Sequence, residues 1–155
     1  LARRVVKAGA SFLEIAESVE AAILKAGAEL AFPVNISCNN AAAHDTADIE
    51  DKRCLNGDEV VKIDAGAHVD GYIADAAITI DLSGKYEDMI KACEEALNCA
   101  LRMCVPGTKV EEISSTIQEV IESYGYKPVS NLTGHKLERY VLHGSVMIPN
   151  IKSSP

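Results

Sequence analysis

Two aspartates, Asp64 and Asp75, are the residues of this chain best suited to hold a metal ion. They flank Asp70-Gly71, a dipeptide typical of a two-residue hairpin turn because glycine tolerates positive φ. In such a hairpin the two aspartates lie on one face as diagonal neighbours, about 7–8 Å apart at Cα. Carboxylates held this close repel each other, and a pair of shared cations relieves that repulsion. The alternative is two solvated aspartates on the wet face of an amphipathic hairpin.

The same turn fixes the register of the hairpin between residues 60 and 80. Gly66 should lie opposite Asp75, and Asp64 opposite Ala77. The small residues Gly66, Ala74 and Ala77 should leave room for metal ions beside the carboxylates. The other face is apolar throughout and should pack on a core. Its residues are Val61, Ile63, Ala65, Ala67, Val69, Tyr72, Ala74, Ala76, Ile78 and Ile80.

Two histidines are further candidates for a functional role. His44 lies in residues 30–51, which lack periodicity and are expected to form a long irregular segment. Binding groups often lie in such loops, although a lone histidine is commonly a surface residue. A strand or extended piece should lead into His135, whose imidazole could join the two aspartates around a transition metal. The alternative is a loop histidine bonded to a neighbouring carboxylate such as Glu138.

The composition favours one soluble globular domain with a substantial core. The chain has 155 residues, 48% of them hydrophobic, and a net charge of −8. The negative charge and the lack of a basic cluster count against nucleic acid as a partner. No long apolar run or leader segment is present, so we expect no membrane association and a cytoplasmic location. The five cysteines match no zinc or disulfide pattern and are expected to be free thiols.

Two helices are expected before the hairpin. The first residues form the end of one helix, which Gly9 closes as a C-terminal cap. Ser11 should begin a second, because Glu14 three residues later completes a capping box. Gly27 should end this second helix. Both helices are interpreted as amphipathic scaffolding.

Two more helices are expected after the hairpin. One covers residues 86–104 and is stopped by a Pro-Gly pair. The next begins at Thr108, which makes a second capping box with Glu111, and ends at Gly125. Two strands followed by two helices on one apolar sheet face indicate an α+β domain.

Three long segments together resemble the methionine aminopeptidases, most closely their type II, archaeal-like branch. They are FPVNISCNNAAAHDT at 32–46, VVKIDAGAHVDGYIADAAIT at 60–79 and NLTGHKLERYVLHGSVMIPN at 131–150. The resemblance implies the α/β "pita-bread" fold, creatinase/aminopeptidase-like, in which two pseudo-symmetric halves hold a pair of metals between sheet strands. It covers only the first part of the enzyme, so residues 1–155 would form an incomplete catalytic domain: the amino-terminal half, with its hairpin and flanking helices.

The resemblance also implies roles for individual residues. Asp75 would bridge two divalent ions (Co, Mn, Fe or Zn), Asp64 would bind one of them, and His135 would be the metal-binding histidine. His44 and His143 would contact the substrate near the scissile bond as catalytic residues. The pocket for the methionine side chain would draw on Phe32, Pro33, Asn35 and Leu142.

The implied reaction is removal of the initiator methionine from nascent polypeptides, close to the ribosome, by a water activated by two metal ions. Members of the family use two further ligands, both glutamates from the C-terminal half, and one of them serves as the general base. No glutamate of this chain falls in a matching motif. The chain alone is therefore expected to bind metal weakly, to be inactive, and to self-associate through an exposed apolar face.

Two other functions remain open at this stage. A non-catalytic pita-bread protein could use the fold as a binding scaffold, but a scaffold has no physical need for the aspartates and histidines. A proline-specific peptidase could share the fold and the ligands. The apolar segment at residues 32–35, suited to a methionine side chain, favours the methionine-specific enzyme.

Overall fold

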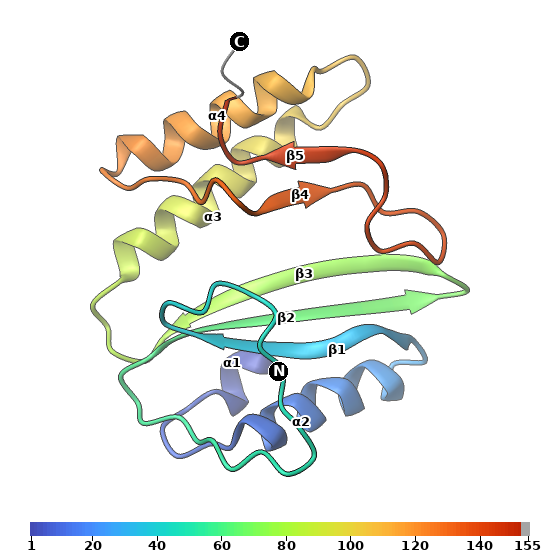
Figure 1. Cartoon of the computed structure of the whole chain (residues 1–155), viewed down its shortest axis with the longest axis vertical. Coiled ribbons are helices and arrows are strands. Elements are labelled where there is room, and N and C mark those ends of the chain that lie inside the picture. Colours follow the sequence, from blue (N-terminus) through green and yellow to red (C-terminus); the bar gives the residue numbers. More distant parts are fainter. Residues whose placement is uncertain (153–155) are drawn as a thin grey trace. The chain divides into compact units, whose positions relative to one another are not determined.

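A computed structural model describes residues 1–152 of the chain (Figure 1). The elements follow in the order α1 (Ala2–Val5), α2 (Phe12–Lys25), β1 (Glu29–Cys38), β2 (Val60–Val69), β3 (Tyr72–Asp81), α3 (Glu87–Met103), α4 (Val110–Ser123), β4 (Thr133–His135) and β5 (Met147–Pro149). The chain forms two compact units. Unit 1 contains residues 1–86 and 138–142, and unit 2 contains residues 87–137 and those from 143 onward.

Unit 1 is built on an antiparallel sheet with the strand order β1-β2-β3 (Figure 1). The turn between β2 and β3 is the predicted one: Asp70 and Gly71 both have positive φ, 51° and 82°. Gly66 pairs with Asp75 and Asp64 pairs with Ala77, so the predicted register is confirmed along the whole hairpin. A two-residue turn leaves the strands no freedom to slip, because a shift by one residue would bring the apolar face to solvent.

The core of unit 1 lies between the sheet and the helices that precede it. Val34 and Ile36 of β1 and Val61 of β2 are fully buried, and they pack with Ile15 and other residues of α2. The prediction that the two later helices cover this face is wrong, because α1 and α2 supply the helical part of this core. The apolar face is buried only near the open end of the hairpin, and Tyr72 beside the turn is 70% exposed.

The first capping box is confirmed at the start of α2. The Ser11 hydroxyl accepts a hydrogen bond from the Glu14 amide at 3.2 Å. Gly27, with a φ of 85°, follows the last residues of the helix as predicted. The prediction that Gly9 closes the first helix is wrong, because α1 ends at Val5 and its C-cap Val6 is extended, with a φ of −77°. Gly9 lies in a later turn, where its amide donates to the Leu55 carbonyl at 2.7 Å. The signals at Ser11 and Gly27 were sufficient because each of these caps involves only near neighbours in the sequence.

The prediction that residues 30–51 form a long irregular segment is wrong for its first part, which is strand β1. The strand is hard to recognise because Pro33 interrupts it and because its pairing with β2 shifts between Leu30 and Phe32 and again between Phe32 and Asn35. Irregularities of this kind break the alternation of apolar and polar residues and redirect side chains. Here they allow Val34 to face the core while Asn35 pairs with Asp64.

Unit 2 combines α3 and α4 with the two short strands β4 and β5. The helices pack through small residues, and Ala92, Ala96 and Ala100 are the buried positions of α3. The second capping box is wrong: Lys109 is the N-cap of α4, and no side chain caps the helix. The predicted extended piece before His135 is confirmed as β4, which pairs with β5.

Two further predictions concern the chain as a whole. All five cysteines are free thiols, as predicted. None of the helices within residues 1–152 has the length and apolar character that crossing a membrane requires.

Candidate functional site

The paired aspartates lie on one face of the β2–β3 hairpin. Asp64 pairs with Ala77 and Asp75 with Gly66, which makes the two carboxylates diagonal neighbours across the ladder. Both residues are only partly exposed, and the Oδ1 atom of Asp64 is buried. The strands around them are continuously hydrogen-bonded, so the backbone holds the two carboxylates at a fixed spacing.

This carboxylate pair fits part of the ligand set of a divalent metal ion. Carboxylate oxygens are suitable ligands for such ions, and two carboxylates on one face favour a cation between them. Within residues 1–152, no group of three or more histidine, cysteine, aspartate or glutamate side chains is arranged to hold a metal. The aspartate pair alone could therefore supply only part of a coordination shell.

His135 and His143 lie together in unit 2. Their ring centroids are 4.4 Å apart with an interplanar angle of 52°. His135 ends strand β4, and its Nδ1 atom is buried, whereas His143 is exposed. The Asn150 side chain holds the approach to β4, because its amide donates to the carbonyl oxygens of Val129 and Leu132. A short paired strand thus fixes the position of the candidate histidine ligand within its unit.

The predicted pocket residues of β1 lie on or beside the face that carries the aspartates. Phe32 pairs with Gly66, and its ring occupies the space where a Cβ of Gly66 would stand. Of the three small residues predicted to leave room for metal ions, Gly66 does not do so, because the Phe32 ring fills the space beside it. Asn35 pairs with Asp64, and its side chain donates to the Pro33 carbonyl at 2.7 Å. Unit 1 thus brings an aromatic ring and an amide next to the carboxylates.

Residues 138–142 form a short segment that belongs to unit 1, contacts the hairpin turn and ends at Leu142. The Tyr140 amide donates to the Gly71 carbonyl at 2.9 Å, and Arg139 Nε donates to the Asp70 carbonyl at 2.8 Å. The Tyr140 ring lies against Gly71, where any Cβ would overlap it. The sequence hint of this contact was Gly71. The hairpin turn already accounts for a glycine at this position, so the hint could not be recognised.

His44 is exposed and adopts a left-handed backbone conformation, with a φ of 64°. The two residues after it run along the outer edge of β1. The Asp45 carbonyl accepts from the Ile36 amide at 2.6 Å, and the Thr46 hydroxyl donates to the Val34 carbonyl at 2.9 Å. His44 is thus held at one end of a short stretch that extends the sheet.

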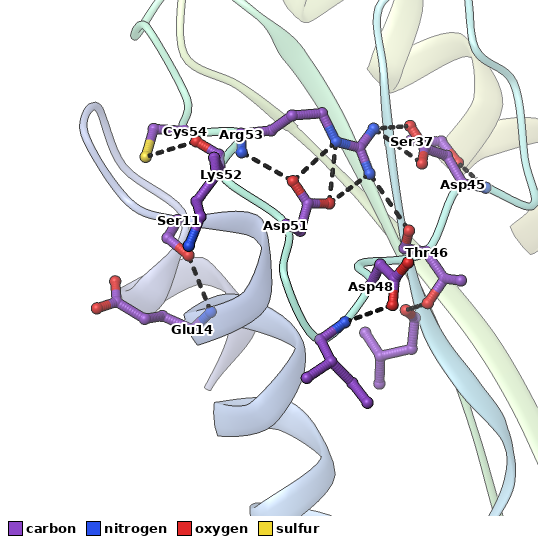
Figure 2. A network of polar contacts seen from close by, with 12 residues as sticks. Ser11, Glu14, Ser37, Asp45, Thr46, Asp48, Asp51, Lys52, Arg53 and Cys54 are labelled. Atoms are coloured by element: carbon purple, nitrogen blue, oxygen red, sulfur yellow. Dashed lines mark hydrogen bonds and ion pairs between the residues drawn. The ribbon is translucent and has the colours of Figure 1, made fainter.

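Arg53 binds this stretch and was missed by the sequence analysis. Figure 2 shows its guanidinium between the carboxylates of Asp45 and Asp51, with Nη2 also donating to the Thr46 carbonyl. The hydrogen bonds from Arg53 lower the pKa of Asp51, and the two carboxylates raise the pKa of Arg53. The sequence does place Arg53 close to a run of acidic residues, but the fold decides which of those carboxylates it binds.

The structure therefore divides the predicted site residues into two groups. Asp64, Asp75, Phe32, Pro33, Asn35, His44 and Leu142 belong to unit 1, and His135 and His143 belong to unit 2. Within unit 1, the sheet register brings Asp64, Asp75 and Asn35 onto neighbouring positions of three strands. Within unit 2, the two histidine rings are in contact.

Comparison with known proteins gives a consistent result. The model of metallopeptidase family M24 matches residues 1–155. The methionine aminopeptidase of Methanocaldococcus jannaschii is 51% identical over 148 residues, which cover 96% of this chain and 50% of that protein. That of Pyrococcus abyssi is 43% identical over 148 residues, again 96% of this chain and 50% of that protein. The chain thus spans about half the length of these relatives.

Solved structures show the same fold. The crystal structure of methionine aminopeptidase from Thermotoga maritima matches with a TM-score of 0.87 and 25% identity, covering 97% of this chain and 64% of that one. The prolidase from Pyrococcus furiosus matches with a TM-score of 0.83 and 25% identity, covering 99% of this chain and 46% of that one. These matches confirm the pita-bread fold and the resemblance to the amino-terminal portion of archaeal methionine aminopeptidases.

Proposed function

Because the chain belongs to metallopeptidase family M24, we propose that residues 1–155 form part of the catalytic domain of a methionine aminopeptidase. The whole protein would remove the initiator methionine from nascent polypeptides. The observation that carries this proposal is the placement of Asp64 and Asp75 on one face of a rigid hairpin, a spacing that suits shared cations. The 51% identity to an archaeal enzyme of that name supports it.

We assign the metal ligands of this chain to Asp64, Asp75 and His135. Asp75 would bridge two divalent ions, Asp64 would bind one of them, and His135 would add an imidazole. Cobalt, manganese, iron and zinc all suit this set of donors. Such ions, when bound, lower the pKa of water and polarise a carbonyl group. The remaining ligands and the general base would come from residues outside the three segments that resemble the family, 32–46, 60–79 and 131–150.

The other site residues would bind and orient the substrate. His44 and His143 would donate hydrogen bonds to the substrate backbone and stabilise negative charge that develops on the scissile carbonyl oxygen. Phe32, Pro33, Asn35 and Leu142 would surround the methionine side chain. The packing of the Phe32 ring on Gly66 supports this role, because a ring held by close contact offers a preformed apolar wall.

A proline-specific peptidase is the second candidate, because prolidases share the fold at a TM-score of 0.83. The methionine-specific function is favoured by the sequence, which is 51% identical to a methionine aminopeptidase and 25% identical to that prolidase. A non-catalytic binding scaffold is the third candidate. The methionine-specific enzyme would meet its substrate in the cytoplasm, near the ribosome. We further propose that these 155 residues alone self-associate through apolar surface that the other half of the two-half fold would cover.

The test of the proposed function is metal-dependent release of methionine from a Met-Ala-Ser peptide by the complete gene product that contains these residues. We expect release in the presence of Co²⁺ or Mn²⁺ and its loss in a chelator. Release only from peptides with proline in the second position would favour the proline-specific enzyme. No release from either peptide class in the presence of any of the four metals would favour the scaffold.

The ligand assignment is tested by calorimetric titration of the same protein with Mn²⁺. Asp75→Ala should abolish metal binding more completely than Asp64→Ala, because only Asp75 would touch both ions. Asp88→Ala, on the exposed surface of α3, is the matched control and should bind as the wild type does. Equal losses for the two aspartate variants would contradict the bridging assignment.

A further inference from the structure

We propose that Arg53 is a positioning residue for His44, an inference that rests on the proposed function because it assumes that His44 contacts the substrate. Arg53 lies nine positions after His44, and it does not touch the aspartate pair through any of its hydrogen bonds. Its guanidinium instead binds Asp51 and the two residues that directly follow His44, Asp45 and Thr46. The proposal therefore concerns the geometry of a candidate catalytic side chain.

The Arg53 guanidinium binds two carboxylates with opposite edges (Figure 2). Nη1 lies 2.9 and 2.8 Å from the two oxygens of Asp45. Nε lies 3.1 and 3.0 Å from the two oxygens of Asp51, and Nη2 lies 2.7 Å from Asp51 Oδ2. Nη2 also donates to the Thr46 carbonyl at 3.2 Å. A planar fork with five donors can satisfy all these acceptors together, and an ammonium group cannot.

Arg53 also contacts the core of unit 1 through Phe12. Its guanidinium carbon lies 4.5 Å from the centroid of the Phe12 ring, and Phe12 is only 6% exposed. The backbone adds a second fixed point, because the Phe12 amide donates to the Arg53 carbonyl at 3.0 Å. Arg53 is thus anchored to the core beside α2, and its guanidinium holds the Asp45 carboxylate in a fixed position.

The residues that Arg53 binds leave His44 little freedom. The Asp45 amide donates to Ser37 Oγ at 3.4 Å, and its carbonyl accepts from the Ile36 amide. With the side chain held by Arg53, every polar group of Asp45 is engaged. His44 directly precedes it with a φ of 64°, a conformation that residues with a Cβ keep only when their surroundings hold it. Loss of Arg53 should therefore release His44 from its left-handed conformation.

The direct test is the order of the His44 backbone in the complete gene product labelled with ¹⁵N-histidine. We expect Arg53→Gln to lower the heteronuclear NOE of the His44 amide and to change its coupling constant, which reports φ. Asp45→Asn, which removes the same ion pair and keeps its shape, should do so as well. Val19→Ala, which removes packing in the same core seven residues after Phe12 on α2, is the matched control. It should leave the His44 signal unchanged.

The functional test is a double-mutant cycle with His44→Ala, read as kcat/KM on a Met-Ala-Ser peptide. Misplacing a group that contacts the transition state should lower kcat/KM by about ten- to a hundredfold. We expect Arg53→Gln to cause such a loss when His44 is present and a change of less than about twofold in the His44→Ala background. Arg53→Lys should resemble Arg53→Gln, since the charge remains but the fork is lost.

Three results would overturn the proposal. One is a loss of the same size in both backgrounds, which would make Arg53 a general stabiliser. The second is wild-type activity in Arg53→Lys, which would make charge alone sufficient. The third is an unchanged His44 signal in Arg53→Gln and Asp45→Asn. If the wild type hydrolyses no peptide, the proposed function fails, whereas the His44 signal still decides whether Arg53 holds this residue.

Discussion

Unit 1 fixes two surface segments to the same sheet by different forces. The segment that follows His44 is held at the outer edge of β1 by the Arg53 guanidinium and its two carboxylates. Residues 138–142 are held at the hairpin turn by the Tyr140 ring on Gly71, a backbone hydrogen bond and the stacking of Arg139 on Tyr72. The first attachment depends on charge, and the second depends mainly on shape.

This difference separates the two segments experimentally. Ion pairs weaken when a carboxylate is protonated or when salt screens the charges. A ring packed against a glycine responds to neither, but it is lost when a side chain occupies the space under the ring. Each segment bears on a residue proposed to contact the substrate, because the first directly follows His44 and the second ends at Leu142. The two attachments can therefore be disturbed one at a time.

The largest effect should come from Gly71→Ala. An added Cβ would overlap the Tyr140 ring, and the residue would also have to keep a φ of 82°. We expect the free energy of unfolding to fall by about 2–3 kcal/mol, which combines the left-handed backbone cost with overpacking. Urea denaturation of the wild type and the variant at pH 7 measures this difference.

Gly84→Ala provides the matched control for that substitution. Gly84 has a similar φ of 69° in the same unit, but an added Cβ would meet nothing within 4 Å. We expect the free energy of unfolding to fall by about 1–2 kcal/mol, because only the cost of the left-handed backbone applies. Equal losses for the two variants would show that the Tyr140 ring moves aside without cost, and the shape-dependent attachment would then be refuted.

The second effect should come from acid. Hydrogen bonds from the Arg53 side chain lower the pKa of Asp51 in the folded state, so Asp51 adds stability above its unfolded pKa of about 3.9. That contribution is lost as the pH falls through the lower, folded pKa. We expect the urea midpoint to fall between about pH 5 and pH 3, with less of a fall in Asp51→Asn.

Acid should also distinguish the two segments. The amide of His44 should lose order over the same range, while that of Tyr140 should keep it. Asp81 and Glu59 have lowered pKa values too, and their protonation should weaken unit 1 in the wild type and in Asp51→Asn alike. The comparison between these two proteins therefore isolates the Arg53 contact. The same fall in both would mean that Asp51 adds no stability.

The sequence predicts those features that depend on near neighbours. The hairpin register follows from Asp70-Gly71 alone, and the cap of α2 follows from Ser11 and Glu14, three residues apart. The same pattern at Thr108 failed because the chain turns there, with the Thr108 amide bonded to the Val105 carbonyl, and the helix begins after Lys109. A capping motif thus predicts a helix start only to within a residue.

The candidate site was predictable only where its residues share one ladder. Asp64 and Asp75 were placed together because the hairpin determines their relation, whereas Phe32 on Gly66 depends on an irregular strand that no periodicity reveals. Arg53 has partners two and eight residues away, and nothing local selects Asp45 over Asp48 or Glu50. That choice is made by β1, which fixes the backbone of Asp45.

The smallest effect should come from salt, and it tests the charge-dependent attachment most directly. In 1 M NaCl the screening length falls to about 3 Å, which is close to the 2.7–3.1 Å separations between the Arg53 nitrogens and the carboxylate oxygens of Asp51 and Asp45. Screening at that length weakens the ion pairs only partly, so we expect a modest loss of order at the His44 amide relative to 0.1 M NaCl.

Tyr140 serves as the internal reference in the salt experiment, because its ring contact and backbone hydrogen bond carry no ionised pair. Its amide should keep the same heteronuclear NOE at both salt concentrations. In Arg53→Gln the His44 amide should already be disordered at low salt and should respond no further. A salt response of the same size at His44 and Tyr140 would show that the two segments loosen together, and the distinction between charge and shape would then not hold.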